Sequence, residues 1–319
     1  SGDPAPEAGT SEGTSAATDD VDPEAASSGD STDTGAAEPT PQDDPFPEDY
    51  PEGCEGVPEP EVFRCAEQLF WDVLRTDLDR RRDAYERFGV LATELADSEH
   101  HALLSRLHFQ RGQLAMALAI EDDAQDLIFE VIPALDQAMA LDPGNGIIPT
   151  WKDSMEIAFA NILGDDVALQ EAAARAWENV ELEPMGNTLS ISGTTIGTAL
   201  DTGIPQHTIE LLDSWVCEGV VWCDDNTWQA PFARPGLGYH FAEAYARVGD
   251  VETAQRYLDE SLSSPGADRW PYRSVAEEAA ADVDAFAARF TAYGESESPF
   301  DIMYANQSYG CQFCHSPAE

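Results

Sequence analysis

Positive charge is scarce in this sequence. It has 16 lysines and arginines against 62 aspartates and glutamates, a formal net charge of −46, and Lys152 is its only lysine. A surface of this sign repels nucleic acids and anionic lipid headgroups. Such an excess of acid is usually a solubility device or an adaptation to salt. Its functional alternative is a docking surface for a basic partner protein.

Other features are also missing. No stretch reaches the roughly 18 to 20 apolar residues of a membrane-spanning helix, and no alternating strand pattern runs beyond a few residues. The sequence contains no nucleophile elbow, no phosphate-binding glycine loop and no HExxH zinc motif. These absences exclude the common hydrolase and nucleotide-binding sites and leave an all-α protein without a conventional catalytic set.

The first 53 residues have almost nothing to bury. Their large apolar residues are Val21, Phe46 and Tyr50, they include 15 acids, and they have no lysine or arginine. A segment of this composition stays disordered, because burial cannot offset the entropy lost on ordering. We predict that residues 1–53 form a disordered acidic tether, which resembles the leader of bacterial lipoproteins. The start at Ser1 indicates a processed form, and a lipid anchor would make the protein surface-tethered.

Residues 54–295 have the apolar spacing of helices, with steps of three and four residues from Val62 onward. Several of the segments begin after aspartate or serine, as helices often do. We predict one helical domain across this range and a separate C-terminal segment at 296–319. The expected helices cover about 62–78, 84–95, 100–119, 123–141, 150–163, 166–182, 206–216, 238–248, 251–263 and 274–292.

An internal repeat is visible in the helical region. Leu141-Asp142-Pro143-Gly144-Asn145 and Leu182-Glu183-Pro184-Met185-Gly186-Asn187 echo each other, and their prolines are 41 residues apart. Pro265 marks a further helix end about two periods later. A period near 40 with two helices per unit indicates a helical solenoid. An irregular helical bundle is the alternative.

One unit of this region resembles a tetratricopeptide repeat. It runs from Phe241 to Pro265, and its small, aromatic, turn, small and bulky positions are Ala242, Tyr245, Gly249, Ala254 and Leu258. The resemblance implies an antiparallel helix pair, and the units before it match more loosely, between about 98 and 266. It also implies a concave surface that binds peptides or partner proteins.

The six cysteines form three close pairs. Two of them, Cys54 with Cys65 and Cys217 with Cys223, are best explained as disulfides between neighbours, although four cysteines permit three connectivities. Paired cysteines are typical of an oxidising compartment, so we expect an extracytoplasmic protein at a cell surface, in a periplasm or secreted. Free thiols in a cytosolic protein are the alternative.

The third pair belongs to Cys311-Gln312-Phe313-Cys314-His315. In this C-x-x-C-H arrangement two thiols can add to the vinyl groups of a haem while the histidine binds the iron. It is the attachment signature of c-type cytochromes, and the resemblance implies one covalent haem c held by Cys311, Cys314 and His315. A zinc site that includes Cys217 or Cys223, or a CxxC disulfide, are the alternatives.

The ligand on the other side of the iron is the open question. Met303 is the nearest candidate, and His240 lies at the start of the best repeat. An open position or a ligand from another chain is also compatible with the sequence. Aromatic residues near position 230 could line a haem site, although such residues are more often core. The further histidines that could bind the iron are His100, His101, His108 and His207. The aromatic residues are Trp215, Trp222, Trp228, Phe232 and Tyr239.

Two functions follow from these patterns. The first is a monohaem cytochrome whose helical scaffold positions the haem for electron transfer to redox partners, some of them basic, or to neighbouring copies of the chain. The second is an extracytoplasmic binding scaffold whose CxxCH is a disulfide or metal site. Both describe a carrier or scaffold rather than an enzyme, with a haem enzyme as a third option.

Overall fold

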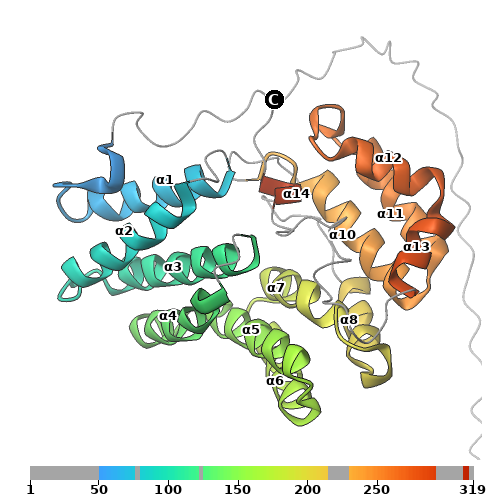
Figure 1. The fold of residues 1–319 in the computed structure, drawn as a ribbon, viewed down its shortest axis with the longest axis horizontal. Coiled ribbons are helices and arrows are strands. Elements are labelled where there is room, and N and C mark those ends of the chain that lie inside the picture. Colours follow the sequence, from blue (N-terminus) through green and yellow to red (C-terminus); the bar gives the residue numbers. More distant parts are fainter. Residues whose placement is uncertain (1–49, 76–79, 122–124, 215–229, 292–311, 316–319) are drawn as a thin grey trace, which may run out of the picture. The chain divides into compact units, whose positions relative to one another are not determined.

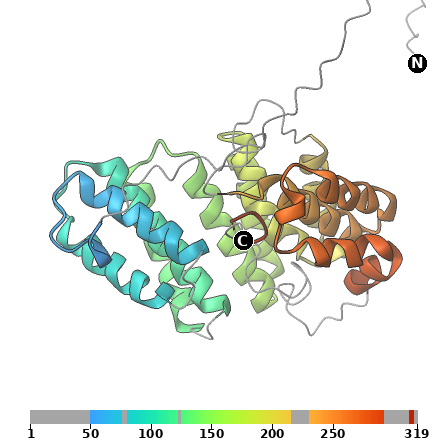
Figure 2. The same cartoon turned by 90° about the horizontal axis from the view of Figure 1, so that it is seen from above.

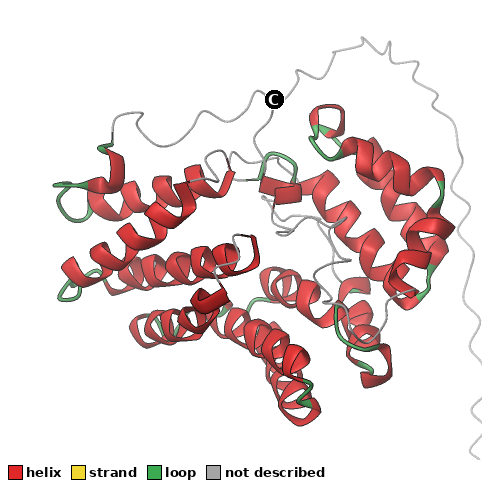
Figure 3. Cartoon of the chain, viewed as in Figure 1, coloured by secondary structure: helices red, strands yellow, loops and turns green. Residues whose placement is uncertain are grey.

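The computed structural model describes residues 50–75, 80–121, 125–214, 230–291 and 312–315 (Figure 1). Within these ranges the chain forms helices and loops and no strand, so the all-α prediction is confirmed for this part (Figure 3). None of the helices described there is long and apolar enough to cross a membrane. The tether predicted at 1–53, apart from its last four residues, and the segment predicted at 296–319, apart from 312–315, lie outside these ranges.

The helices follow one another through short loops. The first six α-helices are α1 (Glu61–Arg75), α2 (Arg81–Glu94), α3 (His101–Glu121), α4 (Ile128–Leu141), α5 (Ile147–Leu163) and α6 (Asp166–Val180). The others are α7 (Pro184–Ile196), α8 (Ile204–Asp213), α10 (Ala233–Val248), α11 (Val251–Ser263), α12 (Arg273–Ala281), α13 (Val283–Thr291) and α14 (Gln312–His315). Single 3-10 turns occupy Glu52–Cys54, Gln125–Leu127, Leu200–Thr202 and Ala267–Arg269.

Two helix predictions need correction. Pro184 not only follows the end of α6 but also begins α7, a helix that the sequence analysis missed. Proline suits this first position, because its missing N–H would have no helical partner there. The helix expected at 274–292 is divided at Asp282, whose carboxylate accepts a hydrogen bond from the Ala285 N–H at 3.0 Å and so caps α13.

Helices that follow one another in the chain lie side by side (Figure 1 and Figure 2). The most extensive packing joins α3 to α4, α5 to α6, and α10 to α11. The same kind of turn joins α5 to α6 and α10 to α11. A glycine with positive φ, Gly164 at 66° or Gly249 at 85°, is followed by an aspartate. Asp165 and Asp250 then cap the next helix by accepting an N–H at 3.1 Å. Glycine is favoured here because other residues are strained at positive φ.

The helix pair formed by α10 and α11 packs through its small residues. Ala242 and Ala254 are completely buried where α10 meets α11, and Leu258 and Tyr245 are buried beside them. Gly238 makes the approach closer still, because a Cβ atom there would lie 2.9 Å from the Ser261 Cβ. Small residues are therefore required at this interface, as the sequence predicts, since larger ones would push the two helices apart.

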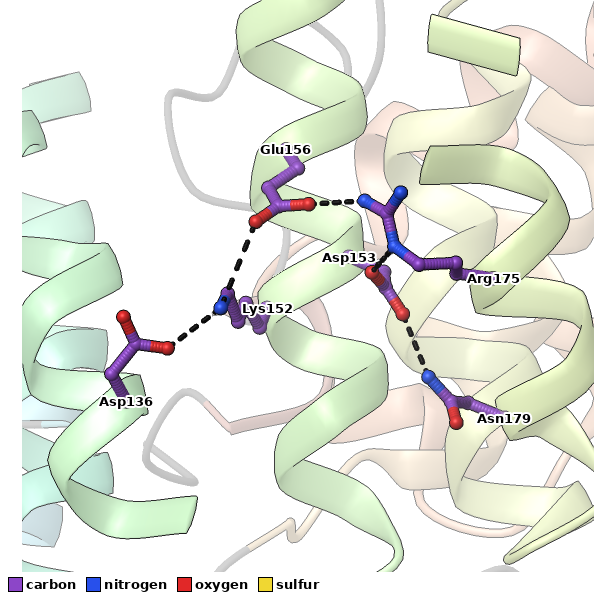
Figure 4. A network of polar contacts seen from close by, with 6 residues as sticks. All are labelled: Asp136, Lys152, Asp153, Glu156, Arg175 and Asn179. Carbon is purple, nitrogen blue, oxygen red and sulfur yellow. Dashed lines mark hydrogen bonds and ion pairs between the residues drawn. The ribbon is translucent and has the colours of Figure 1, made fainter. Parts of the chain in front are cut away.

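The single lysine belongs to a polar network that links α4, α5 and α6 (Figure 4). Lys152 Nζ lies 2.6 Å from Asp136 Oδ1, and Arg175 Nε lies 3.0 Å from Asp153 Oδ1. Asn179 also donates to Asp153 at 2.7 Å, and Glu156 pairs with both cations. Asp153 is buried, so desolvation raises the pKa of its carboxyl, and the bonds from Arg175 and Asn179 counteract that effect.

A third cation, Arg247, joins three helices in the other half of the described chain. Its buried guanidinium donates to the carbonyl oxygens of Thr198 at 3.0 Å, Phe290 at 3.0 Å and Ile196 at 3.4 Å. These carbonyls lie at or just beyond the ends of α7 and α13, where helices leave acceptors unsatisfied. Arg247, from α10, therefore stabilises both helix ends.

Arg247→Met should destabilise the fold by about 3 kcal/mol, because it leaves buried carbonyl groups without donors. Urea unfolding followed by circular dichroism measures this free energy. The matched variant Arg256→Met, at an exposed arginine of α11, should change it by less than about 1 kcal/mol. Equal losses in the two variants would contradict this account of Arg247.

Candidate functional site

The described part of the CxxCH motif is the short helix α14, Gln312–His315, which packs against α10 and α1. Cys311 immediately precedes this helix and lies outside the described residues. α1 belongs to the start of the described chain and α10 to its later part, so the motif meets two helices that are distant in sequence. The surroundings of Phe313, Cys314 and His315 define the candidate site.

Phe313 fixes the motif to the later helices. Only 2% of its surface is exposed. Its ring stacks on that of Tyr239 with a centroid distance of 5.0 Å and an interplanar angle of 6°. The centroid of the Tyr272 ring lies 4.5 Å from that of Phe313. Trp270 completes this aromatic cage, and its Nε1–H donates to the Phe313 carbonyl at 2.7 Å. The ring and the backbone of Phe313 are therefore both held.

The backbone of the motif also lies directly on the first turns of α10. The Phe232 N–H donates to the Cys314 carbonyl at 3.1 Å. Gly236 has no side chain between the two segments, and a Cβ atom there would lie 2.5 Å from Cys314 Sγ and 2.8 Å from the Phe313 carbonyl. Cβ atoms essentially never approach so closely, so only glycine permits this contact.

His315 faces the opposite partner, α1. The His315 and Trp71 ring centroids are 5.3 Å apart at an interplanar angle of 35°. Cys314 and His315 are both half-buried, whereas Phe313 between Gln312 and Cys314 is fully covered. One turn of helix therefore directs its aromatic residue into the core and keeps its thiol and imidazole partly accessible.

The donor chemistry of this turn fits a c-type haem. Attachment needs cysteine thiols that can be reached by the vinyl groups and an adjacent imidazole for the iron. Cys314 and His315 supply one thiol and the imidazole in consecutive helical positions, on a backbone fixed by Phe313. Among the described residues, Cys314 and His315 included, no group of three or more His, Cys, Asp or Glu side chains is arranged to hold a metal ion.

The other predicted ligands have different positions. Met303, Cys217 and Cys223 lie outside the described residues. His240 lies on α10, one turn beyond Gly236, with its Nε2 2.8 Å from the Ser192 hydroxyl. Burial lowers the pKa of His240 to about 4, so its imidazole is neutral near pH 7. A neutral imidazole is the form that binds metals, and its role as the distal ligand stays a prediction.

The remaining histidines have contacts within the helical scaffold. The ring of His207 lies 4.2 Å from Trp177, and His100 meets the edge of Phe63 at 6.2 Å. His108 is buried in α3, and desolvation lowers the pKa of its imidazole. His101 is exposed at the start of α3.

The sequence predicted some of the residues around the motif and missed others. Phe232 and Tyr239 were among the aromatic candidates and do contact α14, while Trp215, Trp222 and Trp228 lie outside the described residues. Trp71 and Gly236 were missed. A glycine inside the helix at 233–248 was the available signal for Gly236, because helical glycines often mark a close approach. Nothing in the sequence pattern related Trp71 to His315.

One of the two predicted disulfides is observed. Cys54 and Cys65 lie at disulfide distance, with their sulfur atoms 2.02 Å apart and their Cα atoms 5.8 Å apart. They join the 3-10 turn at Glu52–Cys54 to α1. Cys217 and Cys223 lie outside the described residues, so their pairing stays a prediction.

No protein-family model matches the chain, and the searches of curated proteins and of solved structures find no match either.

Gly236→Ala should release α14 from α10, because the added methyl group would overlap Cys314 and the Phe313 carbonyl. Overpacking of this kind costs about 1–3 kcal/mol. Cleavage by chymotrypsin after Phe313, followed by mass spectrometry, should be at least about fivefold faster, because it reports the undocked population. Gly112→Ala is the control, since its Cβ atom would have ordinary contacts at 3.5 Å. Equal cleavage rates in all three proteins would refute this packing argument.

The depressed pKa of His240 predicts a loss of stability in acid. The unfolded chain binds this proton near pH 6.5, and the folded chain does so only near pH 4. The free energy of unfolding should therefore fall between pH 6.5 and pH 4 as the unfolded state is favoured. His240→Gln should reduce this fall in urea titrations at pH 7 and pH 4.5. A fall in the His240→Gln variant as large as in the wild type would contradict this assignment.

Proposed function

We propose that this protein is a monohaem c-type cytochrome in which a helical-repeat scaffold holds one covalently attached haem for electron transfer. The observation that carries the proposal is the packing of residues 312–315 of the CxxCH motif against the helical domain. Phe313 is held in an aromatic cage and its backbone is bonded to Trp270, while Cys314 and His315 stay partly accessible. A disulfide clip at this position would need no adjacent histidine.

Each residue of the motif has a definite role in this proposal. Cys311 and Cys314 would hold the haem through thioether bonds, and His315 would bind the iron as the proximal ligand. The haem supplies one-electron oxidation and reduction when bound. Phe313, Trp270 and the Phe232 N–H fix the peptide between Cys314 and the scaffold, so that thiol and imidazole keep one relative position. The acidic surface should favour ferric iron and lower the potential, an effect that salt screens.

The scaffold in this proposal is a tetratricopeptide-like solenoid over residues 54–295. Three glycines with positive φ, Gly164, Gly203 and Gly249, begin or precede helices at intervals of 39 and 46 residues. These intervals support a period near 40. In a solenoid each unit contacts its neighbours, and the array presents a continuous surface to partners. Redox partners with basic surfaces would dock on the acidic exterior. Neighbouring copies of this chain carry the same charge and would need a different contact surface.

We propose an extracytoplasmic location, with residues 1–53 as a tether that could follow a lipid anchor. The Cys54–Cys65 pair supports this location, because disulfides persist in oxidising compartments. Its position matters for the tether: the pair joins the first described turn to α1, directly after the acidic segment. Tension on the tether would therefore reach the helical domain at a cross-linked point.

Coexpression with a cytochrome c maturation system tests the cofactor. The purified chain should show a Soret band, should gain the mass of one haem, and should keep both after denaturation because the bonds are covalent. A Cys311→Ser, Cys314→Ser double variant should lose the covalent haem, and His315→Ala should retain the mass with an altered spectrum. Cys54→Ser with Cys65→Ser is the control and should retain haem.

A colourless protein whose Cys311 and Cys314 become alkylatable after reduction would overturn the cytochrome. In that result the CxxCH is a disulfide or metal site and the helical array is a binding scaffold. Partners captured equally by the wild type and by the Cys311→Ser, Cys314→Ser variant would identify the scaffold function. A redox titration followed by absorbance also tests Met303 against His240 as the distal ligand, because methionine raises the potential.

A further inference from the structure

Trp71 lies on α1, and its ring contacts the ring of His315, the proposed iron ligand. The centroids of the Trp71 and His315 rings lie 5.3 Å apart, within the 4.5–7 Å range of interacting aromatic pairs. The planes of the two rings are inclined at 35°, which is a tilted arrangement and not an edge-on one. The contact therefore restrains the plane of the His315 ring and not only its position.

Trp71 is itself held from behind. Phe70, with 2% of its surface exposed, meets the indole edge-on at 5.1 Å and 76°. Trp71 also packs on the hydrophobic cluster of the first helices, which includes Val73 and Leu74 of the same helix. A wall supported in this way keeps its own orientation, so it can fix the orientation of a ring that rests on it.

The two partners of the motif thus restrain different atoms. α10 and Trp270 hold the backbone of the motif and the Phe313 ring. Trp71 approaches from α1 and contacts that side chain. The orientation of a ligating imidazole is usually set by such outer contacts, which tune the metal through it.

We propose that Trp71 is a positioning residue for His315, which fixes the plane of the imidazole and shields it from water on the α1 side. The inference rests on the proposed function, because His315 is a ligand only if the chain carries haem. Trp71 touches the ligand and acts through it. Its loss should therefore change the properties of the iron without removing the haem.

Trp71→Leu tests this in the haem-loaded full-length protein. Water admitted beside His315 stabilises the more highly charged ferric state. At the wild-type midpoint potential the ratio of oxidised to reduced protein should rise by about threefold, and the ferric electron paramagnetic resonance spectrum should change as the ring plane is released. Trp71→Phe retains an aromatic face and should keep the wild-type spectrum.

Trp151→Leu is the matched control. Trp151 packs on the same hydrophobic cluster and pairs with Phe109, in α5 and α3. The Trp151→Leu variant loses a side chain of the same size from the scaffold. Any redox change caused by general destabilisation of the scaffold should therefore appear in this variant as well. A redox change of equal size in both variants, or no change in Trp71→Leu, would overturn the positioning role while leaving the haem in place.

A second measurement needs no haem. In the full-length Cys311→Ser, Cys314→Ser variant, the ring protons of His315 should be shifted upfield by the Trp71 ring current. Trp71→Leu should remove that shift, and Trp151→Leu should keep it. The two negative outcomes can then be distinguished. A wild-type protein without haem would overturn the proposed function, whereas His315 chemical shifts that do not change in Trp71→Leu would overturn the contact itself.

Discussion

The candidate site depends on the burial of one side chain, Phe313. Its ring occupies a cage of Tyr239, Tyr272 and Trp270, and its carbonyl accepts the Trp270 indole N–H. A short terminal helix of four residues has no stability of its own, because helix nucleation is unfavourable. The cage supplies what the short helix lacks. Cys314 and His315 have definite positions because the residue before them is fixed.

The scarcity of cations gives the few that exist a structural use. Arg247 binds three carbonyl groups at helix ends, and Lys152 and Arg175 satisfy acids between α4 and α6. Acids on the surface need no such partners, since water solvates them. The net charge of −46 therefore coexists with cations that join particular helices. With 62 acids against 16 lysines and arginines, the chain would suit the basic partner proposed above.

Periodicity and turn chemistry predicted most helices, because both are local. The turn at Gly249-Asp250 and the bounds of α11 follow from the sequence, whereas α10 begins at Ala233, five residues before the predicted start. α7 was missed because its polar pattern, with serines and threonines, has weak helical periodicity; Ser192 and Thr195 satisfy their hydroxyls within the helix. The prediction of one long helix at 274–292 was wrong because Asp282 caps a new helix. A single aspartate inside a helical pattern is not a sufficient signal for such a break.

The motif illustrates the same division between local and long-range information. The CxxCH spacing is a local property, so its chemistry can be read directly from Cys311, Cys314 and His315. Its packing joins Phe313 to residues 232–272 and His315 to Trp71, across most of the described chain. Contacts at such separations depend on how every intervening helix packs. The five residues of the motif therefore specify the donor set. The environment of the donors depends on the folded domain as a whole, and this environment would set the potential and the access of water.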